Sequence, residues 1–486
     1  MEETKPLLKE HDKSFGSFGT QLRVVVYVMI YGCAFETSGQ AEPQYIYAYL
    51  KSVTNSTDFK AANDSLQAQK ACIINSTSAS DDKIQGLTSN WSWYISLAQA
   101  GFALPVLMFV GPMADKIGRK PLILWNVLLV CVSLALKTTI VYMNLHLYYY
   151  VVACGILGLS GNFYVFHLAN IAILADCTSE GKERSFVLVV YEALLGLGTA
   201  CSQVGTGYLI QLVGFSYPYL ISSGLMLSLL ILITITLKDP WKPQEITSTL
   251  RFREIPGQLF TLWKSSKQNS KHYVRFLILY FVVYCLYYLP MNGAFSIRTI
   301  YILGEPFCWT SEHIGWYNTI TNCTVYILGG FVIKFLHVCC VRLNDDVISI
   351  FCMLSGVACF VLFGFSTDDS MIYIGTAVGL LRFLPISMIK AVLSRLVSKD
   401  KQGVLFSNVY LLEAVCSLGA ATLFNNIYDQ TLSIYNGLVF FVMAGVSTVA
   451  VLLLIFTSCT NTQHIRDEII IEKSTVQSTE KTELLQ

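Results

Sequence analysis

Long apolar runs recur along this chain, each about 20 residues in length, and they constrain its fold more than any other feature. A helix of that length crosses the hydrocarbon core of a bilayer, whereas a soluble domain needs more polar residues to cover its surface. Hydrophobic residues make up 54% of the chain and charged residues only 13%. We therefore predict an all-α, multi-pass membrane protein in a lipid bilayer. Its twelve expected spans are 23–47, 91–111, 121–142, 147–174, 185–213, 216–237, 274–303, 313–336, 346–365, 371–396, 403–428 and 435–457.

The short loops between the spans predict the orientation of the chain. Lys and Arg lie between spans 2 and 3, between spans 4 and 5 and between spans 10 and 11. The alternate short loops contain neither residue, namely 143–146, 214–215, 366–370 and 429–434. By the positive-inside rule, both termini and the linker between the sixth and seventh spans are expected in the cytosol. The polar N-terminus lacks the short apolar core of a signal peptide, so the first span is expected to act as the insertion signal.

The segment 48–90 is predicted to be a long loop on the opposite side of the membrane. It carries three acceptor sequons for N-linked glycosylation, at Asn55, Asn63 and Asn75. Cys72 lies in this loop, and Cys308 lies in the loop before the eighth span. Two thiols in an oxidising compartment can form a disulfide, and two unpaired thiols are the alternative.

The chain divides into two halves of six spans. The fourth and tenth spans leave the membrane as LADCTSEGKERSF and LSRLVSKDKQGVLF, and each exit is followed by an intramembrane acid, Glu192 or Glu413. This organisation resembles that of the major facilitator transporters, whose parallel six-helix repeats rock about a central cavity. The expected parts are a tail 1–22, bundles 23–237 and 274–457, a cytosolic linker 238–273 and a tail 458–486.

The stretch GPMADKIGRK (111–120) forms the hinge between spans 2 and 3. It resembles the major facilitator pattern G-x-x-x-D-[RK]-x-G-R-[RK] at every fixed position, which here are Gly111, Asp115, Lys116, Gly118, Arg119 and Lys120. Gly118 permits a tight turn that other residues would strain. Asp115 and Arg119 can make a charge-assisted contact between the two halves, which would latch the cytosolic side shut. An ordinary positively charged loop is the alternative.

Three further stretches narrow the resemblance. They are GLSGNFYVFHLANIAILADC (158–177), EPFCW (305–309) and IKAVLSRLVSKDKQGVLF with LFNNIYDQTL (within 389–432). These stretches are similar to the proton-coupled folate transporter family, solute carrier family 46, and closer to its lysosomal member than to the folate carrier. The likeness covers most of residues 90–457.

This resemblance implies roles for individual residues. The family's acid in the fifth span, which is tied to proton coupling, corresponds to Glu192. Its disulfide between the first outer loop and the loop before the eighth span corresponds to Cys72 and Cys308. Its arginine in the tenth span, tied to substrate and proton affinity, corresponds to Lys390, which keeps the charge but not the bidentate geometry.

Two positions depart from the folate carrier. Its histidine in the seventh span falls at Met291, and its aspartate in the fourth span falls at Asn162. These departures argue against folate as the substrate. They leave transport by proton symport as the implied activity.

Ionisable groups inside a span are costly, so each is expected to face a cavity or a partner. Glu192 is expected to take up a proton from an acidic lumen and release it to the neutral cytosol, and a structural hydrogen bond is the alternative. His167 is either a proton relay or a buried neutral histidine. Glu413 is the rival proton carrier. Glu36 and Glu42 lie six residues apart in the first span, so they cannot both face a cavity.

Three cations, Arg298, Arg382 and Lys390, are expected to give the second half a positive cavity. Arg382 and Lys390 are eight residues apart, about 80° around a helix, and would share one side of it. Together the three suit an organic anion. The alternative is that some of them pair with Glu413 or Glu192 and only hold the halves together.

Each terminal tail contains an acid four residues before a pair of leucines, Leu7 and Leu8 at one end and Leu484 and Leu485 at the other. This arrangement resembles the sorting signal that clathrin adaptors read. We therefore expect delivery to the lysosomal or endosomal membrane, with the plasma membrane as the alternative.

These features predict a secondary transporter that couples proton flow to the movement of an organic anion into the cytosol. Folates, peptidoglycan fragments, haem and steroid conjugates remain open as substrate classes. A proton-independent facilitator or exchanger and a non-transporting receptor on the same fold are the alternatives. The formal net charge of +1 does not favour nucleic acid as a partner. No catalytic set, metal cluster or phosphate loop indicates an enzyme, so protons are expected in place of a cofactor or metal.

Overall fold

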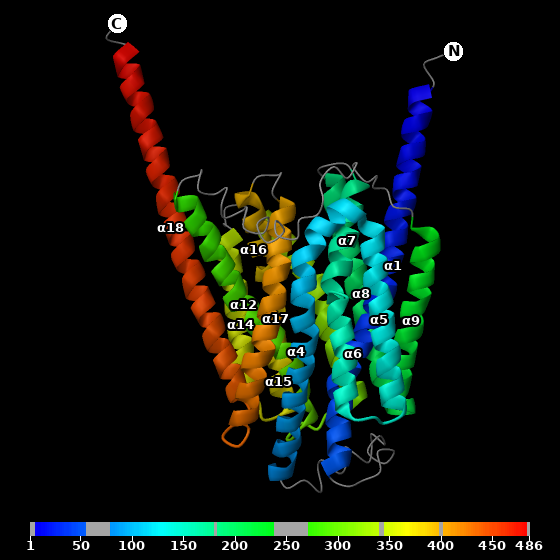
Figure 1. Ribbon diagram of the computed structural model, residues 1–486. Helices are drawn as coiled ribbons and strands as arrows, with labels where there is room; N and C mark the ends of the chain where they lie inside the picture. Colours follow the sequence, from blue (N-terminus) through cyan, green and yellow to red (C-terminus); the bar gives the residue numbers. More distant parts are fainter. Residues whose placement is uncertain are drawn as a thin grey trace.

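The computed structural model describes residues 5–54, 78–178, 182–237, 271–339, 345–397 and 402–483. These residues form two helical bundles that stand side by side, with both termini at the same end of the molecule (Figure 1). We call this the termini end and the opposite one the far end. The expected linker 238–273 lies outside the described residues, apart from the first turn of the helix that follows it.

The first bundle contains six membrane-length segments, one of which is split into two helices. Its elements are α1 (Lys5–Thr54), α4 (Ser78–Ile117), α5 (Arg119–Tyr142), α6 (Leu147–Leu159) with α7 (Asn162–Asp176), α8 (Lys182–Val213) and α9 (Ser216–Thr236). The second bundle repeats this plan. Its elements are α12 (Lys271–Leu303), α13 (Ser311–Cys339), α14 (Asp345–Gly364), α15 (Asp369–Val378) with the 3₁₀ turn η2 (Gly379–Leu381) and α16 (Leu384–Leu396), α17 (Gln402–Thr431) and α18 (Leu438–Glu483). The prediction of twelve spans in two six-helix bundles is confirmed.

Several helices are longer than their apolar spans. Residues 48–54 and 78–90 of the expected loop are helical, because α1 continues to Thr54 and α4 begins at Ser78. Helix α1 likewise begins within the expected N-terminal tail, and α18 continues far into the expected C-terminal one. Hydropathy identifies only the part of a helix that crosses the hydrocarbon core. The helix itself can continue beyond the core where its polar groups find hydrogen-bond partners.

Two of the segments are interrupted. Between α6 and α7, Gly161 and Asn162 both adopt positive φ angles, of 76° and 55°. Glycine enters this left-handed region freely and asparagine is among the residues that tolerate it. Between α15 and α16 the chain passes through the 3₁₀ turn that begins at Gly379, and Pro385 lies in the first turn of α16. Proline lacks the N–H that a continuous helix would need at that point.

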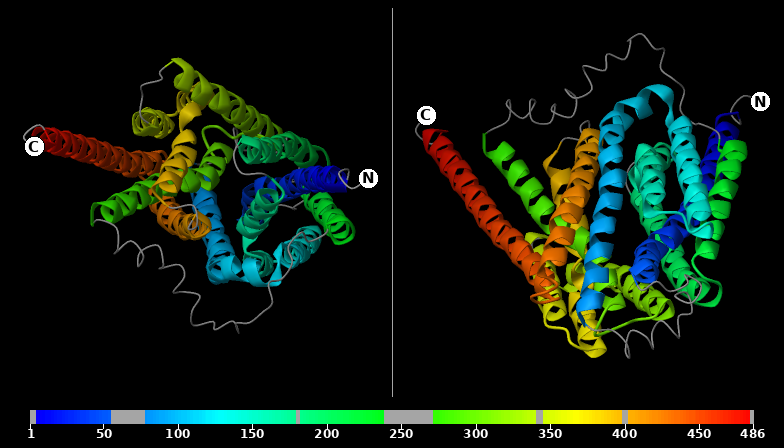
Figure 2. Two further views of the ribbon diagram at one scale, coloured as in Figure 1. Left: turned by 90° about the horizontal axis from the view of Figure 1, so that it is seen from above. Right: turned by 60° about the horizontal axis from the view of Figure 1, so that its bottom comes forward.

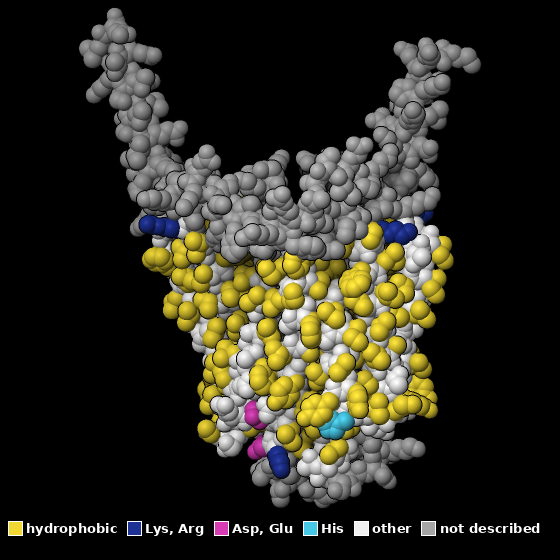
Figure 3. Space-filling view, in the orientation of Figure 1, with side chains coloured by type: hydrophobic (Ala, Val, Ile, Leu, Met, Phe, Trp, Pro, Cys, Tyr) yellow, Lys and Arg dark blue, Asp and Glu magenta, His cyan; other side chains and the backbone are white. Residues whose placement is uncertain are grey.

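The surface of the bundles is apolar over most of their length. Among the described residues, nine helical segments are long and apolar enough to cross a membrane. In Figure 3 hydrophobic side chains cover the visible face between the two ends, and the charged side chains lie toward those ends. The protein is therefore a multi-pass integral membrane protein.

Two pairs of helices form the seam between the bundles. Helix α4 packs along α17, and α8 packs along α13, on opposite sides of the seam (Figure 2, left). The second pair is closely packed at Gly207 and Gly315, since a Cβ on Gly315 would lie 2.8 Å from the carbonyl oxygen of Gln203. Asn322 of α13 also donates a 2.9 Å hydrogen bond to the side-chain oxygen of Gln203.

Candidate functional site

Two acid–base pairs occupy matching positions in the two bundles. In the first bundle, Nε2 of His167 on α7 lies 3.2 Å from Oε1 of Glu192 on α8. In the second, Nζ of Lys390 on α16 lies 2.5 Å from Oε1 of Glu413 on α17. Each pair joins the fourth and fifth segments of its bundle, so the sequence similarity between the halves extends to their charged side chains.

A tyrosine hydroxyl completes each pair. The hydroxyl of Tyr191 lies 3.3 Å from Nδ1 of His167, so both ring nitrogens of the histidine have a polar neighbour. The hydroxyl of Tyr284 donates a 2.5 Å hydrogen bond to Oε1 of Glu413. Glu192 is therefore held by a side chain of α7. Glu413 is held by side chains of α16 and α12.

The two acids differ in burial. The side chain of Glu192 is 52% exposed, whereas that of Glu413 is 8% exposed. Glu192 is therefore the more exposed of the two acids. Glu413 is enclosed by Lys390 and Tyr284.

Tyr410 lies between the two pairs. Its ring centroid is 6.0 Å from that of His167 in the other bundle, and the rings meet edge to face. Nζ of Lys390 lies 5.3 Å from the centre of the same tyrosine ring, within cation–π range. Tyr410 comes from α17, one helical turn before Glu413, so it connects the two pairs through its ring.

A separate cavity in the second bundle contains the two arginines. Its volume is about 40 Å³. It is lined by Met291, Ala294, Phe295, Arg298, Thr321, Asn322, Phe360, Phe363, Arg382 and Phe383. Four of the ten lining residues are phenylalanines, and the charged lining groups are both guanidinium ions. Met291 is also part of this lining.

Arg298 is buried and only partly satisfied. One of its terminal nitrogens donates a 3.1 Å hydrogen bond to the side-chain oxygen of Asn318. Its guanidinium carbon lies 5.1 Å from the ring centre of Tyr317 and 6.0 Å from that of Phe295. The Nε–H group is buried without a hydrogen-bond partner in the described part of the chain. A buried donor of this kind is costly unless a ligand or water accepts its hydrogen bond.

Arg382 is also buried, and its position corrects one prediction. Its Nη1 lies 3.3 Å from the carbonyl oxygen of Gly379 and 3.5 Å from Sγ of Cys359. Arg382 does not share a cavity with Lys390, which pairs with Glu413 instead. The eight-residue spacing would place both on one side of a continuous helix, but the segment is broken at the 3₁₀ turn.

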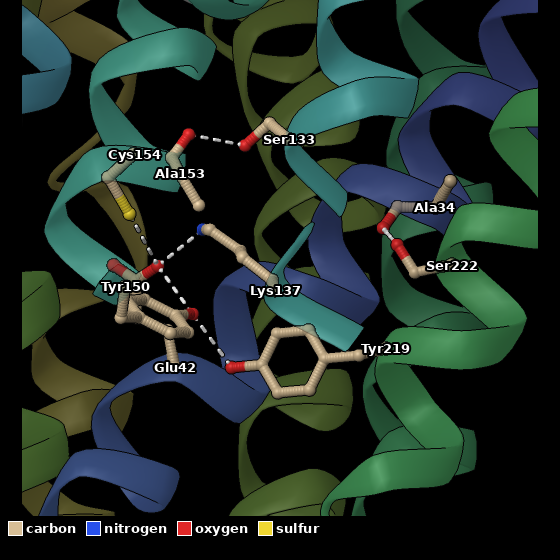
Figure 4. Close-up of polar contacts among 9 residues, drawn as sticks. All are labelled: Ala34, Glu42, Ser133, Lys137, Tyr150, Ala153, Cys154, Tyr219 and Ser222. Atoms are coloured by element: carbon tan, nitrogen blue, oxygen red, sulfur yellow. Dashed lines mark hydrogen bonds and ion pairs between the residues drawn. The ribbon is translucent and has the colours of Figure 1, made fainter. Parts of the chain in front are cut away.

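A third acid–base pair, in the first bundle, was not expected from the sequence. Lys137 of α5, with 2% of its side chain exposed, lies 2.8 Å from Oε2 of Glu42 on α1 (Figure 4). The same oxygen accepts a 3.0 Å hydrogen bond from Tyr150, whose hydroxyl lies 2.9 Å from that of Tyr219. A lone lysine in the apolar run 121–142 was the signal that could have revealed it.

Glu36 and Glu42 face different partners, as their spacing predicts. The side-chain amide of Gln203 on α8 donates a 2.6 Å hydrogen bond to Oε1 of Glu36, while Glu42 points to Lys137. Gln203 also accepts the bond from Asn322 described above, so Glu36 is linked to the seam between the bundles.

The hinge 111–120 lies at the termini end. Gly118 separates α4 from α5 with a φ of 95°, which agrees with the need for glycine there. Arg119 donates a 3.1 Å hydrogen bond to the carbonyl oxygen of Ala172, and Lys120 a 3.2 Å bond to that of Thr234, both within the first bundle. Gly111 and Asp115 lie in the last turns of α4, where side chains are not described, so the latch stays a prediction.

Other predicted residues lie largely outside the described part of the chain. Cys308 is disulfide-bonded, while Cys72 is not described, so their pairing stays a prediction. The same holds for the three sequons and for the C-terminal leucines, which are Asn55, Asn63, Asn75, Leu484 and Leu485. Leu7 and Leu8 belong to α1, but their side chains are not described.

The fold and the two repeated acid–base pairs define a class of protein. The sequence profile of the Major Facilitator Superfamily matches residues 83–421. The chain belongs to this superfamily and is a membrane transporter. The crystal structure of the human organic anion transporter MFSD10 (TETRAN) has a TM-score of 0.65 and 16% identity, covering 90% of this chain and 99% of that one. A peptide transporter in complex with sulfate has a TM-score of 0.64 and 12% identity, covering 90% and 94%.

Within the superfamily, the relatives are members of solute carrier family 46, which confirms the resemblance seen in the motifs. The proton-coupled folate transporter of Rattus norvegicus is 27% identical over 381 residues, which cover 76% of this chain and 79% of that protein. The lysosomal proton-coupled steroid conjugate and bile acid symporter of Homo sapiens is 24% identical over 449 residues, covering 90% and 95%. The probable peptidoglycan muropeptide transporter of Drosophila melanogaster is 21% identical over 376 residues, covering 75% and 72%.

Proposed function

We propose that this transporter is a proton-coupled symporter of an organic anion. The observation that carries the proposal is the cavity lined by Arg298 and Arg382. Two buried guanidinium groups have no acidic side chain among the residues that line this cavity. Because an unpaired buried charge is expensive, the site favours a ligand that supplies negative charge.

The lining also suggests the shape of the ligand. The Nε–H of Arg298 is available as a donor, and arginine binds carboxylate, sulfate and phosphate groups through several parallel hydrogen bonds. Aromatic walls suit a flat apolar body attached to the anionic group. Folates, steroid conjugates, haem and peptidoglycan fragments all carry an anionic group, and the names of the relatives include three of these four classes.

The cavity must widen before such a ligand fits. Ligand pockets have volumes of about 300–1,000 Å³, whereas this one has about 40 Å³. The lining residues come from α12, α13, α14 and the segment between α15 and α16, and Asn322 bonds across the seam to Gln203. Because all these elements belong to the second bundle, movement of the bundles in alternating access would open the site on the side of Asn322, where its bond to Gln203 would break.

The pair formed by His167 and Glu192 is the proposed proton site. Histidine is the residue type that changes charge between pH 5 and pH 8, so a histidine–carboxylate pair can take up one proton on an acidic side and lose it on a neutral one. The matching pair in the second bundle has Lys390 in place of the histidine, and Glu413 is only 8% exposed, so it is the rival site. The large exposed surface of Glu192 also supports proton exchange with water.

The direction of transport follows from the expected topology. By the positive-inside rule we expect the termini end in the cytosol, so the anion and the proton would move from the lumen or the outside into the cytosol. We propose the lysosomal or endosomal membrane as the location, with support from the lysosomal relative and from the two leucine pairs in the tails. We propose that clathrin adaptors bind those leucine pairs.

Uptake of a panel of anions into proteoliposomes under a proton gradient tests the proposal. Accumulation against the substrate gradient is expected at acidic outer pH, and Arg298→Gln should abolish it for every substrate. Glu192→Gln mimics the protonated acid, so driven accumulation should disappear while substrate exchange survives. The matched variant Glu413→Gln should reduce coupling less.

Two results would support the other candidate functions. Uptake that does not respond to the proton gradient would indicate a facilitator or exchanger. Binding of an anion with no uptake at any pH would indicate a receptor. Driven accumulation by Glu192→Gln at low outer pH would place the proton on another residue, with His167 and Glu413 the next to test.

A further inference from the structure

The first turns of α4 are polar and yet buried. Residues 78–90 extend this helix beyond the apolar span that begins at position 91. Asp81, Gln85 and Ser89 follow one another at helical spacing, and their exposed fractions are 2%, 0% and 0%. Polar side chains that are buried outside the apolar span must have specific partners, because burying them unpaired would be costly.

Asp81 binds both bundles. Its Oδ1 accepts a 2.6 Å hydrogen bond from the hydroxyl of Tyr47 on α1. Its Oδ2 accepts a 2.9 Å bond from the side-chain amide of Gln85 and a 3.0 Å bond from the backbone N–H of Glu305. Glu305 follows α12 in the second bundle, so one carboxylate is held by neighbours in its own bundle and by the main chain of the other.

Gln85 extends the contact toward α17. Its side-chain oxygen accepts a 2.6 Å hydrogen bond from the hydroxyl of Tyr428. Its amide lies over Gly304, where a Cβ would come within 2.1 Å of the Gln85 nitrogen, so a side chain at this glycine would displace the amide. One turn further along, the hydroxyl of Ser89 donates to the backbone and side-chain oxygens of Asn425, at 3.0 and 3.1 Å.

We propose that this strip is the gate that closes the far end of the transporter, and that Asp81 is the residue that positions it. We call the strip the far-end gate; it consists of Asp81, Gln85 and Ser89 on one side and Gly304, Glu305, Asn425 and Tyr428 on the other. The inference rests on the proposed transport function, since a carrier that works by alternating access must open this end to admit its substrate.

The geometry explains why Asp81 holds the gate shut. Of the three donors to the carboxylate, only the backbone N–H of Glu305 comes from the other bundle, so this bond forms only while the bundles are together at the far end. When they separate, the bond from Tyr47 stays within its bundle, whereas those from Glu305 to Asp81 and from Tyr428 to Gln85 must break. Asp81 accepts three hydrogen bonds, one of them from the amide of Gln85, and it thereby orients the Gln85 oxygen toward Tyr428, so Asp81 positions the gate.

Distances across the far end test the inference without any substrate or proton gradient. Spin labels are attached at Val53 on α1 and at Ile434 after α17, two exposed positions in different bundles. Their distance distribution is measured in lipid, in a background whose reactive native cysteines are serines. Asp81→Asn replaces one acceptor oxygen with a donor, so the population with a long distance should rise about tenfold. The exposed neighbour Lys83 supplies the control Lys83→Gln, which should leave the distribution unchanged.

A cross-link provides a second measurement in case Asp81→Asn does not fold. Cysteines at Ser89 and Asn425 should form a disulfide when the protein is treated with copper phenanthroline, because the hydroxyl of Ser89 lies 3.0 and 3.1 Å from the backbone and side-chain oxygens of Asn425. The disulfide should reduce uptake to background, and a reductant should restore it. Failure of the pair to cross-link, or full uptake while it is cross-linked, would overturn the inference.

These experiments separate the two proposals. An unchanged distance distribution in folded Asp81→Asn would contradict the gate, whatever the protein transports. A shifted distribution in a protein that accumulates no anion under a proton gradient would support the gate and contradict the proposed symport.

Discussion

The buried pair of Glu42 and Lys137 predicts an unequal response to the removal of its two members (Figure 4). Glu42→Gln leaves Lys137 as an uncompensated charge in a site where 2% of its side chain is exposed, and such a change costs ~3–5 kcal/mol. Lys137→Met leaves Glu42, which is 19% exposed and still accepts the hydrogen bond from Tyr150, so the cost should be lower, ~1–3 kcal/mol.

The double variant Glu42→Gln/Lys137→Met removes both charges together. Because neither buried charge is left without a partner, its stability should lie within ~1 kcal/mol of the unmodified protein. Thermal unfolding of the purified protein, followed by tryptophan fluorescence in one detergent, gives the order of the melting temperatures. The expected order is Glu42→Gln below Lys137→Met, with the double variant above both. The exposed Lys83 supplies the control Lys83→Met, which should not change the melting temperature.

Two results would refute this reasoning. A double variant as unstable as Glu42→Gln would show that the side chains are needed for their shape or hydrogen bonds and not for charge balance. A stable Glu42→Gln would show that water or another acceptor compensates Lys137 in the folded protein.

Three further predictions concern residues whose side chains or partners are not described. Non-reducing peptide mapping should recover Cys72 joined to Cys308, and finding Cys72 as a free thiol under oxidising conditions would end that pairing. Replacing the leucine pairs at 7–8 and 484–485 with alanine should move the protein to the cell surface. Unchanged lysosomal staining would show that neither pair is the sorting signal. Asp115→Ala should lower transport at near-normal expression by weakening closure of the termini end, and the latch is wrong if cavity accessibility from that end stays the same.

The amino-acid sequence by itself determined the number, order and approximate ends of the spans. Transfer of apolar side chains into lipid depends on the local run of residues and on its length, so it can be predicted without knowledge of neighbouring helices. The same local logic predicted the turn at Gly118, where φ is positive, and the division into two bundles of six segments. Repetition of an exit motif and an acid also indicated that Glu192 and Glu413 occupy corresponding places.

Only the tertiary structure decided which charged groups meet. A cation in a span must find a partner, but its sequence position does not say which helix supplies that partner. Lys390 pairs with Glu413, while Arg382 joins Arg298 in a different cavity, because a 3₁₀ turn breaks the helix that would have aligned Arg382 with Lys390.

The buried lysine of α5 and the polar start of α4 show the same limit. Lys137 is neutralised by an acid 95 positions away along the chain, and Asp81 is bound by the backbone of a residue 224 positions away. Contacts at such separations depend on how twelve helices pack in three dimensions. Hydropathy describes each helix separately, so it predicted a loop for residues 78–90. The structure has a helix there, and its polar residues Asp81, Gln85 and Ser89 are buried by packing between the two bundles.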